Sequence, residues 1–184
     1  WKYTGMLQNE QNLKNNAGEE TTDFQRAYVN GKLGGVAVQA GRYNLNIGEG
    51  NVYDNRFDGI QAAYGKDIKL VAGYGKADPG NGKTAEAEEV YYAGLAGKVG
   101  KLALAATYTD FNNIDEVEED DANVWTIGAT YAFDKNISLG AMYLQGEDEV
   151  GGDKDLDDTG YVVTAKYKGA KAAQVGSWGL VAKY

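Results

Sequence analysis

The side chains of this sequence that are best suited to catalysis or metal binding are carboxylates. The 184 residues contain no Cys and no His, which excludes disulfides, zinc fingers, imidazole metal sites and His- or Cys-based nucleophile systems within the chain. Carboxylates by themselves can act as a general acid and base. No spacing in the sequence singles out such a pair, so we expect neither an enzyme nor a cofactor.

Two acidic runs could instead bind cations. They are "DEVEEDD" at 115–121 and "EDEVGGDKDLDD" at 147–158. Several carboxylates close together can hold a divalent cation or repel anions. The segment "DKDLDD" has spaced oxygen ligands but lacks the complete pattern of a calcium loop. The simplest interpretation is therefore two solvated loops, and no metal site is expected.

A Gly-Lys-Thr triplet closes the stretch "GYGKADPGNGKT" at 73–84. A phosphate-binding loop requires a helix after this triplet, and here a strand pattern follows, so that function is excluded. The formal net charge of −9 also opposes a general nucleic-acid interface, which needs clustered Lys and Arg. No nucleic-acid partner is expected.

The elements that must position any site are β-strands. In "KLALAATYTDF" at 101–111, Leu102, Leu104, Ala106 and Tyr108 recur every second residue, which is the period of a strand with one apolar face. The same pattern, ending in an aromatic residue, recurs at 59–64, 68–74, 124–133, 137–143, 161–167 and 178–184. The other face carries Gly, Thr, Ser and Lys, which cannot pack a dry core but can border water. The apolar face is therefore predicted to meet lipid.

About eleven strands are predicted: 1–8, 22–31, 35–43, 57–65, 67–76, 87–97, 100–110, 122–133, 136–146, 158–168 and 176–184. Most have close to the ~9–11 residues that a tilted strand needs to cross a bilayer. Tight turns alternate with longer polar segments near 9–21, 44–56, 77–87, 111–121 and 147–158. This alternation favours an all-β fold, a transmembrane antiparallel up-and-down β-barrel. A soluble antiparallel barrel or sandwich is the alternative.

Aromatic residues at both strand ends predict two girdles at the water boundaries. The predicted girdle residues are Tyr64, Tyr74, Tyr108, Tyr131, Phe133, Tyr143, Tyr167, Trp178 and Tyr184. The opposite parity carries cations, whose long stems can cover the wall while their charged heads stay in water. These predicted pore-wall residues are Lys69, Lys101, Lys166, Lys168 and Lys183.

An odd number of strands cannot close an up-and-down barrel with every neighbour antiparallel. An open edge in lipid would leave a row of unpaired backbone groups, each costing several kcal/mol. We therefore expect residues 1–184 to be one partial barrel domain, truncated at both ends.

Residues 24–64 resemble the general diffusion porins of Gram-negative outer membranes. The resemblance rests on "RAYV" at 26–29, a Gly-rich turn, "GRY" at 41–43, "YD" at 53–54 and "RFDGI" at 56–60. The tail "GSWGLVAKY" and the acidic segments look more like the porins that are tethered through S-layer-homology domains. The resemblance implies a sixteen-stranded barrel in the outer membrane of a diderm bacterium.

The resemblance also implies a function and partners. Such porins are homotrimers in membrane lipid that let small hydrophilic solutes and ions diffuse through a water-filled channel. A link to peptidoglycan or another cell-wall polymer would need a domain outside these residues. A structural barrel with a plugged lumen that anchors the envelope, and a soluble ligand-binding barrel, are the alternative functions.

In these porins the loop after the Gly-Arg strand folds into the pore. The resemblance thus nominates residues 44–56, with Glu49 and Asp54 as acidic groups and with Arg42, Arg26 and Arg56 facing them. Opposite charges across a narrow aqueous passage create a field that orients dipolar solutes and penalises apolar ones.

Arg42 is expected to face the lumen, since a midplane arginine in lipid would cost about 2–4 kcal/mol. The parity of residues 35–43 is unsettled by the sequence: if Arg42 faces water, so do Val36, Val38 and Ala40, which leaves Ala37 and Gln39 outside. A bulge near Gly41, or an outer face covered by a neighbouring subunit, would resolve the conflict.

Overall fold

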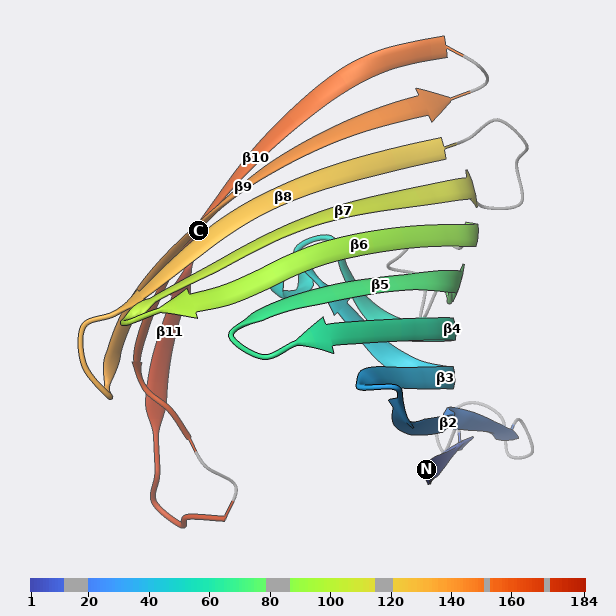
Figure 1. Cartoon of the computed structure of the whole chain (residues 1–184), viewed down its shortest axis with the longest axis horizontal. Coiled ribbons are helices and arrows are strands. Elements are labelled where there is room, and N and C mark those ends of the chain that lie inside the picture. Colours follow the sequence, from blue (N-terminus) through green and yellow to red (C-terminus); the bar gives the residue numbers. More distant parts are fainter. Residues whose placement is uncertain (12–19, 79–86, 115–120, 151–152, 171–172) are drawn as a thin grey trace.

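The computed structural model describes residues 1–11, 20–78, 87–114, 121–150, 153–170 and 173–184. They form a single antiparallel sheet of eleven strands in which chain neighbours are always sheet neighbours (Figure 1). The strands are β1 Lys2–Gln11, β2 Glu20–Leu33, β3 Val36–Ile47, β4 Tyr53–Gly65, β5 Ile68–Ala77, β6 Ala87–Val99, β7 Leu102–Ile114, β8 Asp121–Ala132, β9 Ile137–Val150, β10 Asp153–Lys168 and β11 Gly179–Lys183. The predicted all-β, up-and-down meander is confirmed.

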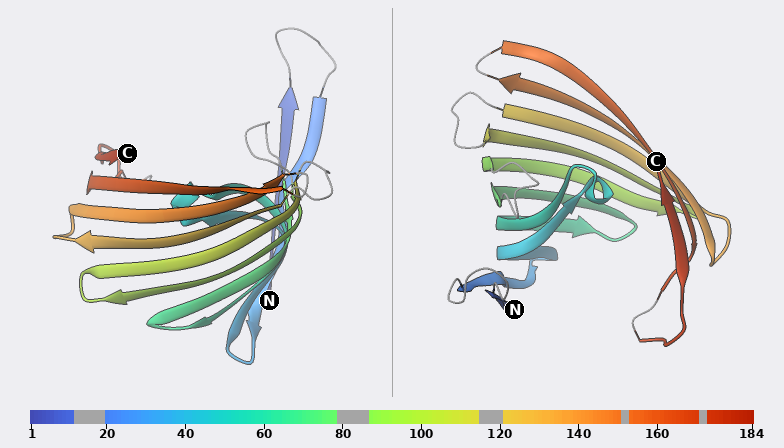
Figure 2. Two further views of the ribbon diagram at one scale, coloured as in Figure 1. Left: turned by 90° about the horizontal axis from the view of Figure 1, so that it is seen from above. Right: turned by 180° about the vertical axis from the view of Figure 1, so that it is seen from behind.

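The sheet is strongly curved, and the tip of the β3–β4 hairpin lies on its concave side (Figure 2). β1 pairs with β2 and β11 pairs with β10, so the described sheet is open between its first and last strands. A 3-10 turn at Gly48–Gly50 is the other regular element among the described residues. In that part of the chain no helix has the length and apolarity to span a membrane.

Several strands are longer than predicted. β3 continues to Ile47 and β4 begins at Tyr53, and β9 and β10 pair as far as Val150 and Asp153. The segments 44–56 and 147–158 are therefore mostly paired strand, and their prediction as loops was wrong. The ladder needs no membrane to continue, because backbone pairing and cross-strand contacts stabilise it in water too. Most of the acidic run 115–121 lies outside the described residues.

The two faces of the sheet differ as predicted. On one face the register places Leu70 beside Leu95 and Leu104 beside Ala129, within an apolar band. These leucines are exposed, as expected for side chains whose solvent is lipid. On the other face the Thr126 hydroxyl donates a hydrogen bond to that of Thr107 at 3.1 Å. The hairpin tip packs on this second face, so the polar face is concave and the apolar face convex.

Aromatic residues gather at both ends of the convex face. Toward the long connections the rings pair as Tyr74–Tyr91, Tyr108–Trp125 and Tyr143–Tyr161, with centroids 4.8, 4.5 and 5.3 Å apart. Toward the tight turns they pair as Tyr131–Phe133 and Tyr167–Trp178, at 5.0 and 5.7 Å. Tyr64 is exposed at the turn end, and Tyr184 pairs with Val163 through backbone hydrogen bonds of 2.8 and 2.9 Å. Tyr91, Trp125 and Tyr161 were not among the predicted girdle residues, and the cross-strand register adds them to the belts.

The β8–β9 turn shows how the tight connections are fixed. The Asp134 carboxylate accepts hydrogen bonds from the backbone N–H groups of Asn136 and Ile137, at 2.6 and 2.9 Å. These two bonds favour the charged form and hold the pKa of Asp134 below its usual range. An Asp that caps its own turn in this way is a sequence-local signal, so such turns are predictable.

Three glycines form a row across the sheet where the hairpin leaves the wall. Gly41 pairs with Gly59, and Gly59 with Gly75. A Cβ on Gly59 would lie 2.3 Å from the Tyr74 carbonyl oxygen and 2.4 Å from the Phe57 ring. Beyond this row β3 pairs with β2 only to Arg42, and β4 with β5 only to Phe57. The glycines therefore permit the close backbone approach at which the hairpin turns inward.

Replacing Gly59 with Ala should destabilise the folded protein by about 1–3 kcal/mol, because the added methyl overlaps backbone atoms that cannot move independently. Urea titration in detergent, followed by tryptophan fluorescence, measures this effect. Gly169→Ala is the matched control, since a Cβ there meets no atom within 4 Å. If Gly59→Ala and Gly169→Ala had equal urea midpoints, the close backbone approach at the glycine row would not require glycine.

Candidate pore constriction

The hairpin that crosses the concave side consists of residues 42–58, and we call it the inner hairpin. Its two arms remain paired to each other, with Tyr43 opposite Phe57 and Ile47 opposite Tyr53. Figures 1 and 2 show it inside the curve of the sheet and not at its rim. The segment that the sequence analysis nominated as a pore loop is therefore a β-hairpin folded into the interior.

One face of the inner hairpin is apolar and fixes it to the wall. Tyr43, Leu45, Ile47, Tyr53 and Phe57 are all buried there. The Phe57 ring is fully buried and lies 5.9 Å from that of Tyr92 on β6.

Hydrogen bonds at the same wall reinforce this packing. The Tyr92 hydroxyl donates to the Gln61 side chain at 2.8 Å and lies 3.3 Å from the Tyr43 hydroxyl. The alternation of Tyr43, Leu45 and Ile47 was the signal that could have revealed this strand extension from the sequence.

The tip of the inner hairpin reaches distant strands. Gly48 lies against Thr126 on β8, and the Asn51 amide nitrogen is 3.8 Å from the Met142 sulfur on β9. Glu49 lies farthest across, where its carboxylate is 4.0 Å from the Lys166 ammonium on β10. The hairpin thus spans the concave side from β3 and β4 to β10.

The other face of the inner hairpin, turned away from Tyr92, is polar. Arg42 donates two hydrogen bonds to Asp58, at 2.8 and 2.6 Å, and also contacts Asp23 at 3.3 Å. Arg56 pairs with Asp23 at 2.7 Å and with Asp78 at 3.1 Å. Because Asp23 contacts both arginines, the five side chains form one arginine–aspartate cluster at the base of the hairpin.

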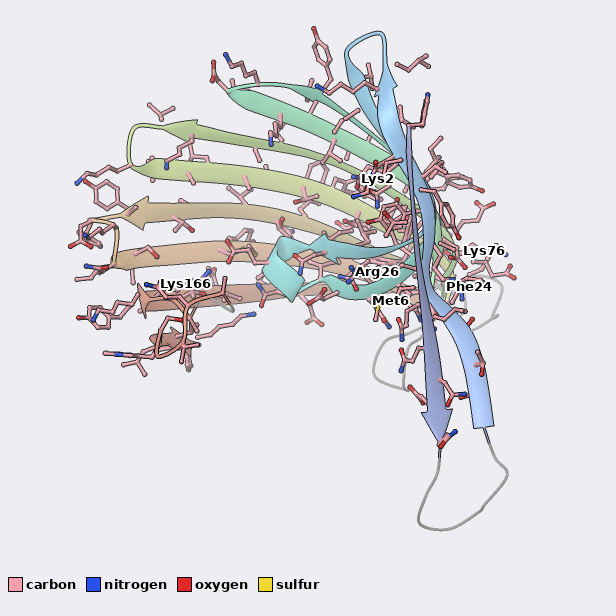
Figure 3. All side chains as sticks on the ribbon, turned by 90° about the horizontal axis from the view of Figure 1, so that it is seen from below. Lys2, Met6, Phe24, Arg26, Lys76 and Lys166 are labelled. Atoms are coloured by element: carbon pink, nitrogen blue, oxygen red, sulfur yellow. The ribbon has the colours of Figure 1, made fainter. Side chains whose placement is uncertain are left out.

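The remaining nominated residues lie apart from that cluster. Asp54 accepts a hydrogen bond from the Asn44 amide at 2.9 Å, partway along the polar face. Arg26 stands on β2 on the side of the sheet that holds the hairpin, whereas Phe24 and Lys76 point away from it (Figure 3). Asp23, Asp58 and Asp78 were not predicted as site residues, since only the folded structure brings these carboxylates to the arginines.

The parity of residues 36–42, which the sequence left unsettled, is fixed by the sheet register. Gln39 pairs with Gln61, which hydrogen-bonds Tyr92 on the concave side, so Gln39 and Ala37 face inward. Val36, Val38 and Ala40 consequently face the convex side. Arg42 shares their parity but lies past the glycine row, where the strand has left the wall and its side chain meets carboxylates. Neither a bulge nor a neighbouring subunit is needed to accommodate it.

The predicted pore-wall lysines separate into two groups. Lys69, Lys166 and Lys183 lie on the concave face, as their strand parity requires. Lys101 belongs instead to the β6–β7 turn, where its ammonium donates to the Phe133 carbonyl oxygen at 2.6 Å. Lys168 ends β10 over the rings of Tyr167 and Trp178, at 5.3 and 4.6 Å. The last two lysines were therefore wrongly placed on the wall.

Three further lysines share the concave parity and were missed. They are Lys2 and Lys32 on β1 and β2, and Lys98 on β6. Lys98 and Lys69 line a space of about 490 Å³ between the hairpin tip and the wall, together with Thr107, Thr130 and Thr164. Hydroxyl, amide and ammonium groups at this density can hold water or a small polar solute.

Comparison with known proteins gives the family. Residues 2–177 match the model of the Gram-negative porin family, a span that includes ten of the strands and the inner hairpin. No curated protein matches the chain. Because the match covers far more than half of the chain, an outer-membrane location and a porin-type β-barrel follow for it. This chain belongs to the Gram-negative porin family.

Proposed function

We propose that the protein forms a water-filled channel for the passive diffusion of small hydrophilic solutes and ions across the outer membrane. The observation that carries the proposal is the inner hairpin. Its apolar face is fixed to the wall, and its polar face, with Arg42, Asp54 and Arg56, is turned to the interior. A hairpin built in this way narrows an aqueous passage without filling it with apolar side chains.

Within this proposal the constriction is formed by Glu49 and Asp54, with Arg42, Arg56 and Arg26 as its basic groups. The support is that four of the five lie on the hairpin and Arg26 lies on the strand beside it. The carboxylates Asp23, Asp58 and Asp78 join this set. They neutralise much of the arginine charge, so the transverse field is weaker than five isolated charges would give.

The channel is tested with purified protein in planar bilayers at 1 M KCl. Stepwise insertions with a linear current–voltage relation are expected, and silent bilayers with folded protein would defeat the proposal. Swelling of proteoliposomes separates a channel from the structural anchor with a plugged lumen. An anchor leaves the swelling rate unchanged for sugars of every size, whereas a channel admits the smaller ones faster.

Replacing Arg42 with Ser should shift ion selectivity toward cations, because the carboxylates of Asp58 and Asp23 lose their shared partner. We expect the permeability ratio of K⁺ to Cl⁻ to rise about twofold, as judged from the reversal potential in a KCl gradient. Lys168→Gln removes one positive charge at the membrane rim and should leave the ratio unchanged. If the permeability ratio of the Arg42→Ser channel equals that of the wild type, Arg42 lies outside the narrow region.

The homotrimer, the sixteen-stranded barrel and tethering to a cell-wall polymer stay predictions from the resemblance. The homotrimer can be tested directly. Light scattering gives the mass of the detergent-solubilised protein, which distinguishes one chain from three.

A further inference from the structure

Charges of opposite sign occupy the two ends of the concave face. On the half toward the tight turns, the face carries Lys2, Lys32, Lys69, Lys98, Lys166 and Lys183. Asp67, in the turn between β4 and β5, lines the same space as Lys69 and Lys98. Among the described residues this half of the wall is therefore strongly cationic.

The half toward the long connections is acidic. On the side of the sheet that holds the inner hairpin, the carboxylates of this half are Glu10, Asp23, Asp54, Asp58, Asp78 and Asp158. Arg26, Arg42 and Arg56 balance only part of this charge, since the carboxylates on this side outnumber them and Arg42 and Arg56 both contact Asp23. The charge therefore changes sign along the barrel axis.

The inner hairpin marks the boundary between the two halves. Its tip carries Glu49 within 4.0 Å of Lys166, so the acidic and the cationic walls meet there. At 0.1 M salt, charges act over about 10 Å, whereas at 1 M they act over about 3 Å. In a narrow passage a few ångströms from these side chains, their charges therefore set the local ion concentrations at low salt. At high salt the same charges are largely screened.

We propose that the channel rectifies ionic current at low ionic strength. The inference rests on the proposed channel. Cations concentrate in the acidic half and anions in the lysine-lined half. A voltage positive on the long-connection side drives both ions toward the hairpin, which fills the passage with carriers. The opposite voltage drives both ions away from it and depletes them. Current is therefore larger when the long-connection side is positive.

The test is the current–voltage relation of the purified protein inserted from one side of a planar bilayer. At 0.1 M KCl the currents at equal positive and negative voltages should differ about twofold or more, and at 1 M KCl they should be equal. The absence of native cysteine allows Lys135→Cys to report orientation. A bulky impermeant thiol reagent reduces the current only when it is added on the side of the β8–β9 turn.

The variant Lys69→Gln/Lys98→Gln/Lys166→Gln should remove the asymmetry at 0.1 M KCl, and its current at 1 M KCl, recorded in parallel, shows that channels have formed. Lys101→Gln/Lys135→Gln is the matched control, because it neutralises turn lysines off the wall, and it should rectify like the wild type. If the triple variant does not fold, the single variants Lys69→Gln and Lys98→Gln replace it, and each should reduce the asymmetry at 0.1 M KCl.

Symmetric wild-type currents at 0.1 M KCl would overturn the inference, as would rectification that persists undiminished in the triple variant or, where that variant does not fold, in both single variants. Silent bilayers would instead defeat the channel itself, so the two failures are distinct.

Discussion

Leu104→Lys is expected to destabilise the membrane-embedded protein by about 2–4 kcal/mol, whereas Ala105→Lys should be nearly neutral. The two residues are neighbours on β7, yet their side chains lie on opposite faces of the sheet. Leu104 belongs to the convex apolar band beside Ala129, and Ala105 lines the space at the hairpin tip. A lysine at 104 would carry its charge into hydrocarbon, while a lysine at 105 would join water and other cations.

Reversible urea unfolding in lipid vesicles, followed by tryptophan fluorescence, measures both variants on the same strand. Because the neighbours share local backbone structure, strand propensity cancels in the comparison. If Leu104→Lys left the free energy of unfolding unchanged and Ala105→Lys lowered it, the lipid-facing and water-facing sides would be the reverse of our assignment. The proposed channel would then fail as well.

Phe57→Ala should release the inner hairpin from the wall. Phe57 is fully buried and contacts the rings of Tyr43, Tyr53 and Tyr92, with centroids 5.6, 6.5 and 5.9 Å away. Deleting a buried phenylalanine side chain costs about 3–5 kcal/mol. Since the loss falls on the contact that holds the hairpin, we expect a larger and noisier single-channel conductance as well as lower stability.

Phe133→Ala is the matched control, because this phenylalanine is half-exposed at the turn-side belt and pairs only with Tyr131 among the ring contacts of the described residues. It should leave the conductance unchanged. Conductance that stays at the wild-type level in Phe57→Ala, with a folded barrel, would show that the hairpin is held by other contacts.

The sheet was predictable from the sequence because its signals are local. A strand in a bilayer must alternate, and Leu102, Leu104 and Ala106 display that alternation within a few residues. The turn aspartate and the aromatic strand ends are equally local. Strand order then followed from the short connections, and all eleven strands occur near their expected positions.

The interior was less predictable, since it depends on register. Asp23 lies far from Arg42 and Arg56 along the chain, and no spacing rule brings these residues together. Residues 44–56 were interpreted as a loop because Asn44, Asn46 and Asp54 make the segment polar on average. The apolar residues that alternate with them, such as Leu45 and Ile47, indicate a strand. The parity of residues 36–42 stayed open in the sequence for a related reason: Arg42 was expected to face water, and only the structure shows that the strand leaves the wall at Gly41.

β9 and β10 remain paired beyond Tyr143 and Tyr161, which belong to the aromatic girdle at the membrane boundary. The paired strands past these residues therefore project out of the lipid. From Tyr161 to Asp153 the paired strand extends for about 25 Å along its own direction at ~3.3 Å per residue. Barrels of this kind have their longer connections on the extracellular side, so we expect an extracellular protein to contact this paired extension before it contacts the lipid headgroups. An antibody that binds there would recognise a paired backbone with one fixed shape.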